Sequence, residues 1–335
     1  MSNKIKIAID AMGGDNSPKK IIDGINISLK FNKNNFFSLY GRQEILEKEI
    51  TRNKSIEQYC EIINTKDIIK DDESPLVAAK TGRDSSMWKA IESQKENRTD
   101  ISLSAGNTGA LLLISRLLLK SINGINKPAL AGLWPNNLGM NVVLDLGANI
   151  ECNEKNLVDF ACMGSALFKS LFKNDNPRIA ILNIGLEENK GSDTLKKTYS
   201  ILKENKIKNF DFRGFIEGNH IMDGNVDVII TDGFTGNVAL KTAEGTANFI
   251  TKNLKKALNK LSIIISYKSL KKFKEKLDPR KYNGAIFLGL QSPVVKSHGS
   301  TDAIGFAHSI EVCHKIVQAN LIKKIKSHLI TVDAE

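Results

Sequence analysis

Short apolar segments, each followed by a glycine-containing loop and then a helical pattern, recur along most of the 335 residues. This alternation restricts the fold more than any other feature of the sequence. Strand patterns lie at 4–10, 35–40, 101–104, 141–145, 178–184 and 226–231, and helical patterns at 18–31, 74–95, 107–120 and 154–173. Repeated strand–loop–helix units predict a three-layer α/β/α fold with a mainly parallel sheet. The connections between its parallel strands should be right-handed.

No proline-rich linker, internal repeat or low-complexity tract divides the sequence, so residues 1–335 are expected to form a single domain. One segment, 248–281, departs from the alternation and reads as a helical excursion. Within it an apolar cluster, 261–270, stands between two lysine-rich stretches. This cluster either rests on an anionic membrane or packs in a dimer interface or helical hairpin. A final packing helix is expected over 302–329.

The formal net charge is +11, and the four cysteines are far apart in the sequence. The charge reflects either a composition rich in Lys, Asn and Ile or a partner that is nucleic acid, an anionic membrane surface or an acidic protein. The lysines are dispersed without a zinc finger or an aromatic RNA-binding pattern, which argues against nucleic acid. No Cys/His cluster has zinc-ligand spacing, so neither a metal nor a cofactor is expected. Because 4–10 resembles a strand rather than a signal peptide, a cytoplasmic location is expected.

Five glycine-containing loops follow predicted strands, and ligands are expected there. They are Asp10–Asp15, Ser104–Gly109, Asp145–Asn149, Asn183–Gly185 and Thr231–Asn237. Ligands of open parallel sheets bind beyond the carboxyl ends of the strands, so all five loops are expected at one edge. Gly, Asn, Ser and Thr are also ordinary turn residues, and one such loop alone would indicate little. Several at one edge predict an anionic ligand.

The loop that ends in Asn107, Thr108 and Gly109 illustrates the chemistry. Asn107 and Thr108 can cap the following helix, whose first N–H groups remain free and whose dipole favours an anion. The loops lack the sequence patterns of a P-loop and of a Rossmann dinucleotide site. The nucleophile elbow of serine hydrolases is also missing. A nucleotide or a covalent serine intermediate is therefore not expected.

A second cluster, Lys296-Ser297-His298, lies in a short loop flanked by apolar residues before the last helix. Lysine supplies a compact positive charge for phosphate, and histidine can donate a proton or a hydrogen bond. An isolated histidine is more often structural than catalytic. Its place beside Lys296, Ser297 and a glycine makes this loop a candidate site.

Five motifs together resemble the bacterial phosphate acyltransferase family, PlsX, and they occur in the family's order between about residues 4 and 330. They are Asp10-Ala-Met-Gly-Gly-Asp15, Ser104-Ala-Gly-Asn-Thr-Gly-Ala-Leu111, Leu144-Asp-Leu-Gly-Ala-Asn149, Thr231-Asp-Gly-Phe-Thr-Gly-Asn-Val-Ala-Leu-Lys-Thr242 and Val295-Lys-Ser-His-Gly299. Several long motifs in order are much more specific than any single loop.

The resemblance implies an enzyme that converts an acyl-acyl carrier protein and inorganic phosphate into an acyl phosphate and free carrier. It implies that the product feeds a membrane glycerol-3-phosphate acyltransferase in phospholipid synthesis. It also implies a cytoplasmic homodimer with peripheral membrane contact. The implied fold is similar to isocitrate and isopropylmalate dehydrogenases and to phosphotransacetylase. A positive surface would attract the acidic carrier protein.

For this chemistry, positioning two bound reactants and stabilising the carbonyl oxyanion can supply most of the rate. Because a thiolate leaves readily, no covalent acyl-enzyme is required. The phosphate-binding assignment comprises Asn107, Thr108, Gly109 and Ser297, with Lys296 beside them. His298 is assigned to the oxyanion or to the leaving sulfur. Asp232 and Asn237 complete the catalytic set as supports of the loops.

Two other enzymes of the same fold class remain as alternatives, a phosphotransacetylase and an NAD-dependent decarboxylating dehydrogenase. The dehydrogenase would need clustered carboxylates for a divalent ion and a loop that binds adenine. Asp145, Asp227 and Asp232 do not form an obvious metal-binding set in the sequence. Binding of NAD would separate this alternative from acyl transfer.

Overall fold

The computed structural model describes residues 4–172, 174–204, 209–257 and 278–329 of the chain. Its described strands form one 11-stranded sheet in the order β3-β2-β1-β4-β11-β10-β5-β6-β9-β7-β8. The strands are β1 (Ile5–Asp10), β2 (Asn35–Gly41), β3 (Cys60–Asn64), β4 (Ile101–Ser104), β5 (Ala129–Pro135), β6 (Met140–Leu144), β7 (Arg178–Asn183), β8 (Asp211–Glu217), β9 (Val228–Ile230), β10 (Ala285–Leu288) and β11 (Val294–Lys296).

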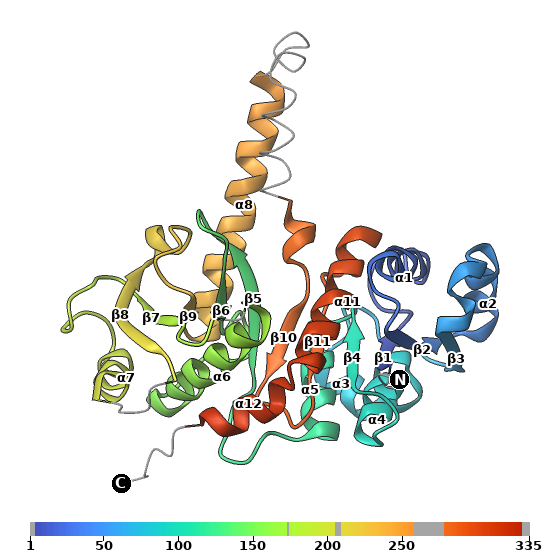
Figure 1. The fold of residues 1–335 in the computed structure, drawn as a ribbon, viewed down its shortest axis with the longest axis horizontal. Helices are drawn as coiled ribbons and strands as arrows, with labels where there is room; N and C mark the ends of the chain where they lie inside the picture. The colour runs from blue at the N-terminus through green and yellow to red at the C-terminus, as the bar shows by residue number, and fades with distance from the viewer. Residues whose placement is uncertain (1–3, 173, 205–208, 258–277, 330–335) are drawn as a thin grey trace.

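Helices connect most of these strands, as the alternating pattern predicts (Figure 1). They are α1 (Lys19–Phe31), α2 (Gln43–Arg52), α3 (Pro75–Thr81), α4 (Ser86–Lys95), α5 (Thr108–Leu119), α6 (Glu154–Phe172), α7 (Asp193–Glu204), α8 (Gly233–Ala257), α11 (Ala303–Gln318) and α12 (Leu321–His328). The prediction of an α/β fold with a mainly parallel sheet is therefore confirmed.

The apolar residues of the central strands alternate between two cores, one on each face of the sheet. In β9, Val228 and Ile230 belong to the core under α1, α6, α11 and α12, whereas Ile229 belongs to the core under α3, α4 and α5. Successive side chains of a strand point to opposite faces, so a strand covered on both sides is apolar throughout. This double burial explains the continuous apolar runs in the sequence.

Two strands in the middle of the sheet reverse its direction. β10 is antiparallel to both β11 and β5, and β5 is antiparallel to β6. As a result β6, β9, β7 and β8 run opposite to β1, β4 and β11, although each group is parallel within itself. The loops after β6, β7 and β9 thus leave the edge opposite to the loops after β1 and β4. The prediction that all five glycine loops lie at one edge is wrong, because neither antiparallel strand was recognised in the sequence.

Two predicted helices are each divided in the structure. The pattern at 74–95 forms α3 and α4, separated by a 3-10 turn at Gly82–Asp84, after which the Ser85 hydroxyl accepts the Trp88 N–H at 3.2 Å. The pattern at 302–329 forms α11 and α12, because Asn320 adopts a left-handed backbone with φ of 52°. Both breaks come from local caps that an apolar period does not reveal.

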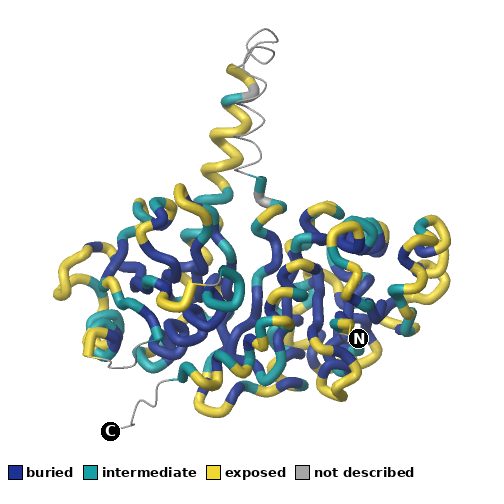
Figure 2. Tube along the Cα trace, viewed as in Figure 1, coloured by how far each residue is buried: buried dark blue, intermediate teal, exposed yellow. Residues whose placement is uncertain are grey.

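α8 leaves the body of the molecule as a long projection whose outer part is exposed (Figures 1 and 2). It begins at Gly233, well before the predicted start of the excursion at 248. The apolar cluster 261–270 lies outside the described residues. None of the helices in the described ranges combines the length and apolar character that crossing a membrane requires.

Candidate functional site

Three loops meet beyond the carboxyl ends of the neighbouring parallel strands β1, β4 and β11, and they form what is called here the three-loop site. The loops are 10–15, 104–109 and 296–299. The Asp15 N–H donates to the Gly299 carbonyl at 3.0 Å, and the Ser297 N–H donates to the Ser104 carbonyl at 2.9 Å. Two of the five predicted glycine loops and the predicted Lys296–His298 loop therefore come together.

Gly14 shows how tightly these loops pack. Its φ is +80°, and a Cβ atom there would lie 2.9 Å from the Ala105 carbonyl oxygen, the Gly299 carbonyl oxygen and Lys20 Nζ. A side chain would be strained by the backbone conformation and would also collide with both other loops. Glycine is therefore required at this position for the three loops to converge.

A buried carboxylate, Asp10, ties the first two loops together. It accepts hydrogen bonds from the Ser86 hydroxyl at 2.6 Å and the Ser104 hydroxyl at 2.7 Å. Ser104 in turn accepts the Gly106 N–H at 3.0 Å. Burial raises the pKa of Asp10, and the two serine hydrogen bonds oppose that change. Asp10 was seen in the sequence only as part of a motif; its partners come from separate elements and carry no local signal.

The helix α5 begins at the three-loop site with an exposed first turn. The Asn107 side-chain oxygen accepts the Ala110 N–H at 3.0 Å, which confirms the predicted cap. Within the described residues, the N–H groups of Asn107, Thr108 and Gly109 have no protein acceptor. Together with the helix dipole, these groups form a site suited to an anion.

The side chain of Asn107 has a second structural task. Its Nδ2 donates to the carbonyls of Lys70, Asp71 and Glu73, at distances from 2.8 to 3.4 Å. These bonds hold the segment before α3 against the start of α5. Gly109 allows the same approach, because a Cβ there would lie 2.6 Å from Pro75 Cγ. The two residues therefore shape the site through packing, whereas their backbone N–H groups remain available to a ligand.

Lys296 ends β11 and is almost completely buried, with 8% of the residue exposed. Its Nζ donates to the Ala105 carbonyl at 3.2 Å and to the carbonyl of Ser297. Burial lowers the pKa of this ammonium group to about 8, and the nearby charge of Lys20 lowers it further, against the effects of Asp71 and Asp10. A buried cation beside a helix N-terminus is the arrangement expected for an anion site.

Ser297 and His298 are both fixed by Asn283, which precedes β10. Asn283 Nδ2 donates to the Ser297 hydroxyl at 2.8 Å, and Asn283 Oδ1 accepts the His298 N–H at 2.8 Å. Ser297 is fully buried, so its side chain orders the loop. His298 is exposed, and its Nδ1 lies 3.0 Å from the Ser300 hydroxyl. Partial desolvation and the charge of Lys296 lower the pKa of His298, which favours a neutral ring.

Lys20, which belongs to none of the predicted motifs, is the second buried lysine of the three-loop site. It lies in the first turn of α1, only 5% of the residue is exposed, and its Nζ donates to the Gly299 carbonyl. Burial lowers its pKa, whereas Asp15 and Asp71 oppose the change. The signal available in sequence was a lysine on the apolar face of a helix directly after a glycine loop.

Asp232 and Asn237 follow β9 and lie in the other group of loops. Asp232 accepts the Thr235 N–H at 2.8 Å and the Thr235 hydroxyl at 2.9 Å, as a cap of α8. Asn237 Nδ2 donates to the Leu146 carbonyl at 3.2 Å. Asp232 therefore supports its own loop, whereas Asn237 joins the start of α8 to the loop after β6. Among the described residues, neither side chain is hydrogen-bonded to the three-loop site.

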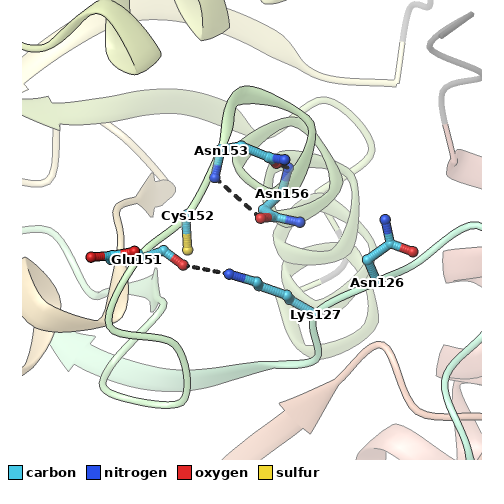
Figure 3. A pocket seen from close by; sticks show the side chains of 6 residues that line it. All are labelled: Asn126, Lys127, Glu151, Cys152, Asn153 and Asn156. Carbon is cyan, nitrogen blue, oxygen red and sulfur yellow. Dashed lines mark hydrogen bonds between the residues drawn. The ribbon is translucent and has the colours of Figure 1, made fainter.

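A pocket of about 320 Å³ lies between the segment before β5 and the start of α6 (Figure 3). It is lined by Asn126, Lys127, Glu151, Cys152, Asn153 and Asn156. Lys127 Nζ is bonded to the Glu151 carbonyl at 2.7 Å, and burial raises the pKa of Cys152 to about 11. This thiol is therefore a poor nucleophile. Across the described ranges, no three His, Cys, Asp or Glu side chains are grouped in a way that could hold a metal ion.

Comparison with known sequences decides the family. Residues 5–324 match the sequence family described as "Fatty acid synthesis protein". The phosphate acyltransferase of Pelagibacter ubique is 58% identical over 334 residues, which cover 98% of this chain and 100% of that protein. The chain belongs to the phosphate acyltransferase family. The phosphate acyltransferase of Rhodospirillum rubrum is 41% identical over 334 residues, covering 98% of this chain and 95% of that protein. The family expected from the five motifs is confirmed.

Solved structures show that this chain shares its fold with phosphotransacetylases. The enzyme from Streptococcus pyogenes superimposes with a TM-score of 0.65 at 16% identity, covering 96% of this chain and 95% of that one. The EutD phosphotransacetylase from Staphylococcus aureus gives 0.61 at 14% identity, covering 94% of each chain. The predicted likeness to phosphotransacetylase is confirmed for the fold, whereas the likeness to isocitrate and isopropylmalate dehydrogenases stays a prediction.

Proposed function

We propose that the chain transfers a fatty acyl group from an acyl-acyl carrier protein to inorganic phosphate, giving an acyl phosphate and free carrier. The observation that carries the proposal is the buried Lys296 ammonium group beside the open first turn of α5. Membership of the phosphate acyltransferase family supports acyl transfer to phosphate as the reaction. That the acyl donor is an acyl-acyl carrier protein is a further step of the proposal, beyond what family membership supports.

In this proposal phosphate binds between Lys296 and the N–H groups of Asn107, Thr108 and Gly109. The helix dipole and the lysine charge hold the anion and orient one oxygen toward the thioester carbonyl carbon. That oxygen forms the new C–O bond, the carbonyl oxygen takes up negative charge, and the C–S bond then breaks. The departing thiolate takes a proton from solvent or from a neighbouring group. No covalent acyl-enzyme is required.

His298 is suited to stabilising the oxyanion. Its Nδ1 faces the Ser300 N–H at 3.3 Å and the Ser300 hydroxyl at 3.0 Å, so Nδ1 acts as an acceptor and Nε2 carries the proton. A neutral ring with Nε2–H can donate to the developing oxyanion without losing its proton. Its lowered pKa favours this role over that of a general acid, because the protonated ring is then less populated near neutral pH.

The test follows acyl phosphate formation by the purified enzyme from acyl-acyl carrier protein and inorganic phosphate. Lys296→Ala and His298→Ala should each reduce the rate, by about 10²–10³-fold if each group stabilises the anion or oxyanion directly. Lys281→Ala, which removes an exposed lysine just before β10, is the matched control and should retain the rate. Near wild-type rates in both site variants would contradict this assignment.

Two other enzymes are kept as alternatives on this fold. A phosphotransacetylase would use an acyl-coenzyme A donor, and the shared fold is compatible with it. Replacing acyl-acyl carrier protein by acyl-coenzyme A in the same assay separates the two donors. A decarboxylating dehydrogenase would bind NAD, which a direct titration detects.

The wider setting belongs to the same proposal. We take residues 1–335 as one phosphate acyltransferase domain that acts in the cytoplasm as a homodimer and passes acyl phosphate to a membrane glycerol-3-phosphate acyltransferase. The cluster 261–270 would contact anionic lipid peripherally, or else pack against a second subunit. Sedimentation with anionic vesicles tests this point: Ile264→Asp should reduce binding, and unchanged binding would remove the membrane contact from the proposal.

A further inference from the structure

Lys20 has no part in the function proposed above, yet its environment is unusual for a lysine. Lysines are rarely so deeply buried unless they are paired with a charge. Its bond to the Gly299 carbonyl replaces only part of the hydration that the ammonium group has lost. Among the described residues, no carboxylate lies within ion-pair distance of Lys20 or Lys296.

The two buried ammonium groups retain donors for a ligand. An ammonium group has three N–H donors. Lys20 uses one of them on the Gly299 carbonyl, and Lys296 uses two on the carbonyls of Ala105 and Ser297. The remaining donors have no acceptor within the described part of the chain. The carbonyl groups are neutral, and Asp10, Asp15 and Asp71 act on the two charges only from beyond ion-pair distance.

The geometry places both groups around the same backbone. The Lys296 Nζ bonds to the Ala105 carbonyl, and this oxygen and Lys20 Nζ each lie 2.9 Å from the position that a Gly14 Cβ would occupy. Ala105 immediately precedes the loop that opens α5. The two ammonium groups repel each other, and burial disfavours the charge of each. An anion of high charge that binds between them would stabilise both charged forms.

We propose that Lys20 is a second cationic ligand of the phosphate, acting with Lys296 and the first turn of α5, and that this pair selects a doubly charged phosphoryl group. The inference rests on the proposed function, since it assigns a further residue to the same phosphate site. Asp10, Asp15, Asp71 and His298 are the other titratable groups whose charges act on the two lysines or respond to them. The attraction of phosphate to the two lysines must therefore exceed its repulsion by Asp71 and Asp15.

The experiment is calorimetric titration of the full chain with inorganic phosphate, without an acyl donor. Lys20→Met should weaken binding on the order of ten- to a hundredfold, the loss expected for one charged hydrogen bond. Lys19→Met is the matched control, because Lys19 is the exposed neighbour on α1, and it should bind as the wild type does. Lys20→Gln should also bind weakly, although its amide can still donate to the Gly299 carbonyl. Weaker phosphate binding by Lys20→Gln would therefore be due to the lost charge and not to the lost hydrogen bond with the Gly299 carbonyl.

A second readout follows the pH dependence of phosphate binding. Removing the charge of Lys20 should move the alkaline limit of binding in Lys20→Gln to higher pH, because Lys296 then loses a repelling neighbour. Suppose that the wild type forms acyl phosphate but that Lys20→Gln has an unchanged phosphate affinity and an unchanged alkaline limit. This result would overturn the role of Lys20 and leave the proposed function intact. A wild type that neither binds phosphate nor forms acyl phosphate would instead overturn the proposed function.

Discussion

Asn283 Oδ1 accepts the backbone N–H of His298 at 2.8 Å, which fixes the histidine at the end of the β10–β11 hairpin. The same side chain donates to the Ser297 hydroxyl and to the Gly305 carbonyl at 2.9 Å. Asn283 thus links the loop that carries Lys296 and His298 to the start of α11. Asn283 contacts the loop residues that are proposed to act on the substrates and is not itself assigned to the substrates, so it is a positioning residue.

Asn283→Ala should therefore lower kcat more than it changes the KM for phosphate. The substitution removes the amide donor to the Ser297 hydroxyl and one of the two side-chain donors to the Gly305 carbonyl, the other being the Ser309 hydroxyl. This loss should reduce the free energy of unfolding by about 1–3 kcal/mol. Steady-state kinetics and urea unfolding measure the two effects. Gln291→Ala is the control, since Gln291 also bonds a backbone carbonyl, that of Ser121 at 3.1 Å, but outside the three-loop site. An unchanged kcat in a folded Asn283→Ala enzyme would refute the positioning role.

Phosphate use should decline as pH rises through about 8, because the pKa of Lys296 is lowered by burial to about that value. Below this pH the side chain is charged and binds phosphate; above it the side chain is neutral. The alkaline limb of kcat/KM for phosphate should disappear in Lys296→Arg, since arginine keeps its charge throughout this range. An alkaline limb that persists at the same pH in Lys296→Arg would assign it to another group.

Lys296→Met should inactivate the enzyme and stabilise the phosphate-free fold. A lysine with a pKa lowered from 10.5 to about 8 destabilises the folded state while it is charged, by on the order of 1–3 kcal/mol after its two hydrogen bonds are considered. The unfolded chain binds the proton more tightly, so this penalty is full below pH 8 and is lost as pH rises through 10.5. Thermal unfolding at pH 7 and pH 10 measures it. A Tm for Lys296→Met below that of the wild type at pH 7 would contradict the prediction.

Asp232→Ala should lower stability and leave phosphate affinity unchanged. Asp232 caps α8 through Thr235, and loss of such a cap costs about 1 kcal/mol. Its loop follows β9, whose direction is opposite to that of β4 and β11. Chemical unfolding and phosphate titration are the two measurements. Weakened phosphate binding with normal stability would support the catalytic role that the sequence motif predicts for Asp232.

Much of the fold was predictable because local patterns encode it. Strands buried on both faces are apolar throughout, as in β9, and the Asn107 cap marks the start of α5. The short strands β10 and β11 were not predicted. They are three or four residues long, and their pairing joins segments distant in sequence. Missing β10, together with the equally unpredicted β5, led to the wrong prediction that all the glycine loops share an edge, because these two strands carry the antiparallel pairings.

The sequence by itself determined the α/β class, the family and the motifs that contain Asn107, Lys296 and His298, because each is written in contiguous residues. Only the tertiary structure decided which motifs meet. The loops after β1, β4 and β11 meet because these strands are parallel neighbours, whereas the reversals at β10 and β5 place the loop after β9 at the opposite edge of the sheet. The tertiary structure also places Lys20 beside the Gly299 carbonyl, 279 residues away in sequence. Burial and long-range hydrogen bonds turn an ordinary helical lysine into a candidate phosphate ligand, and neither is encoded locally.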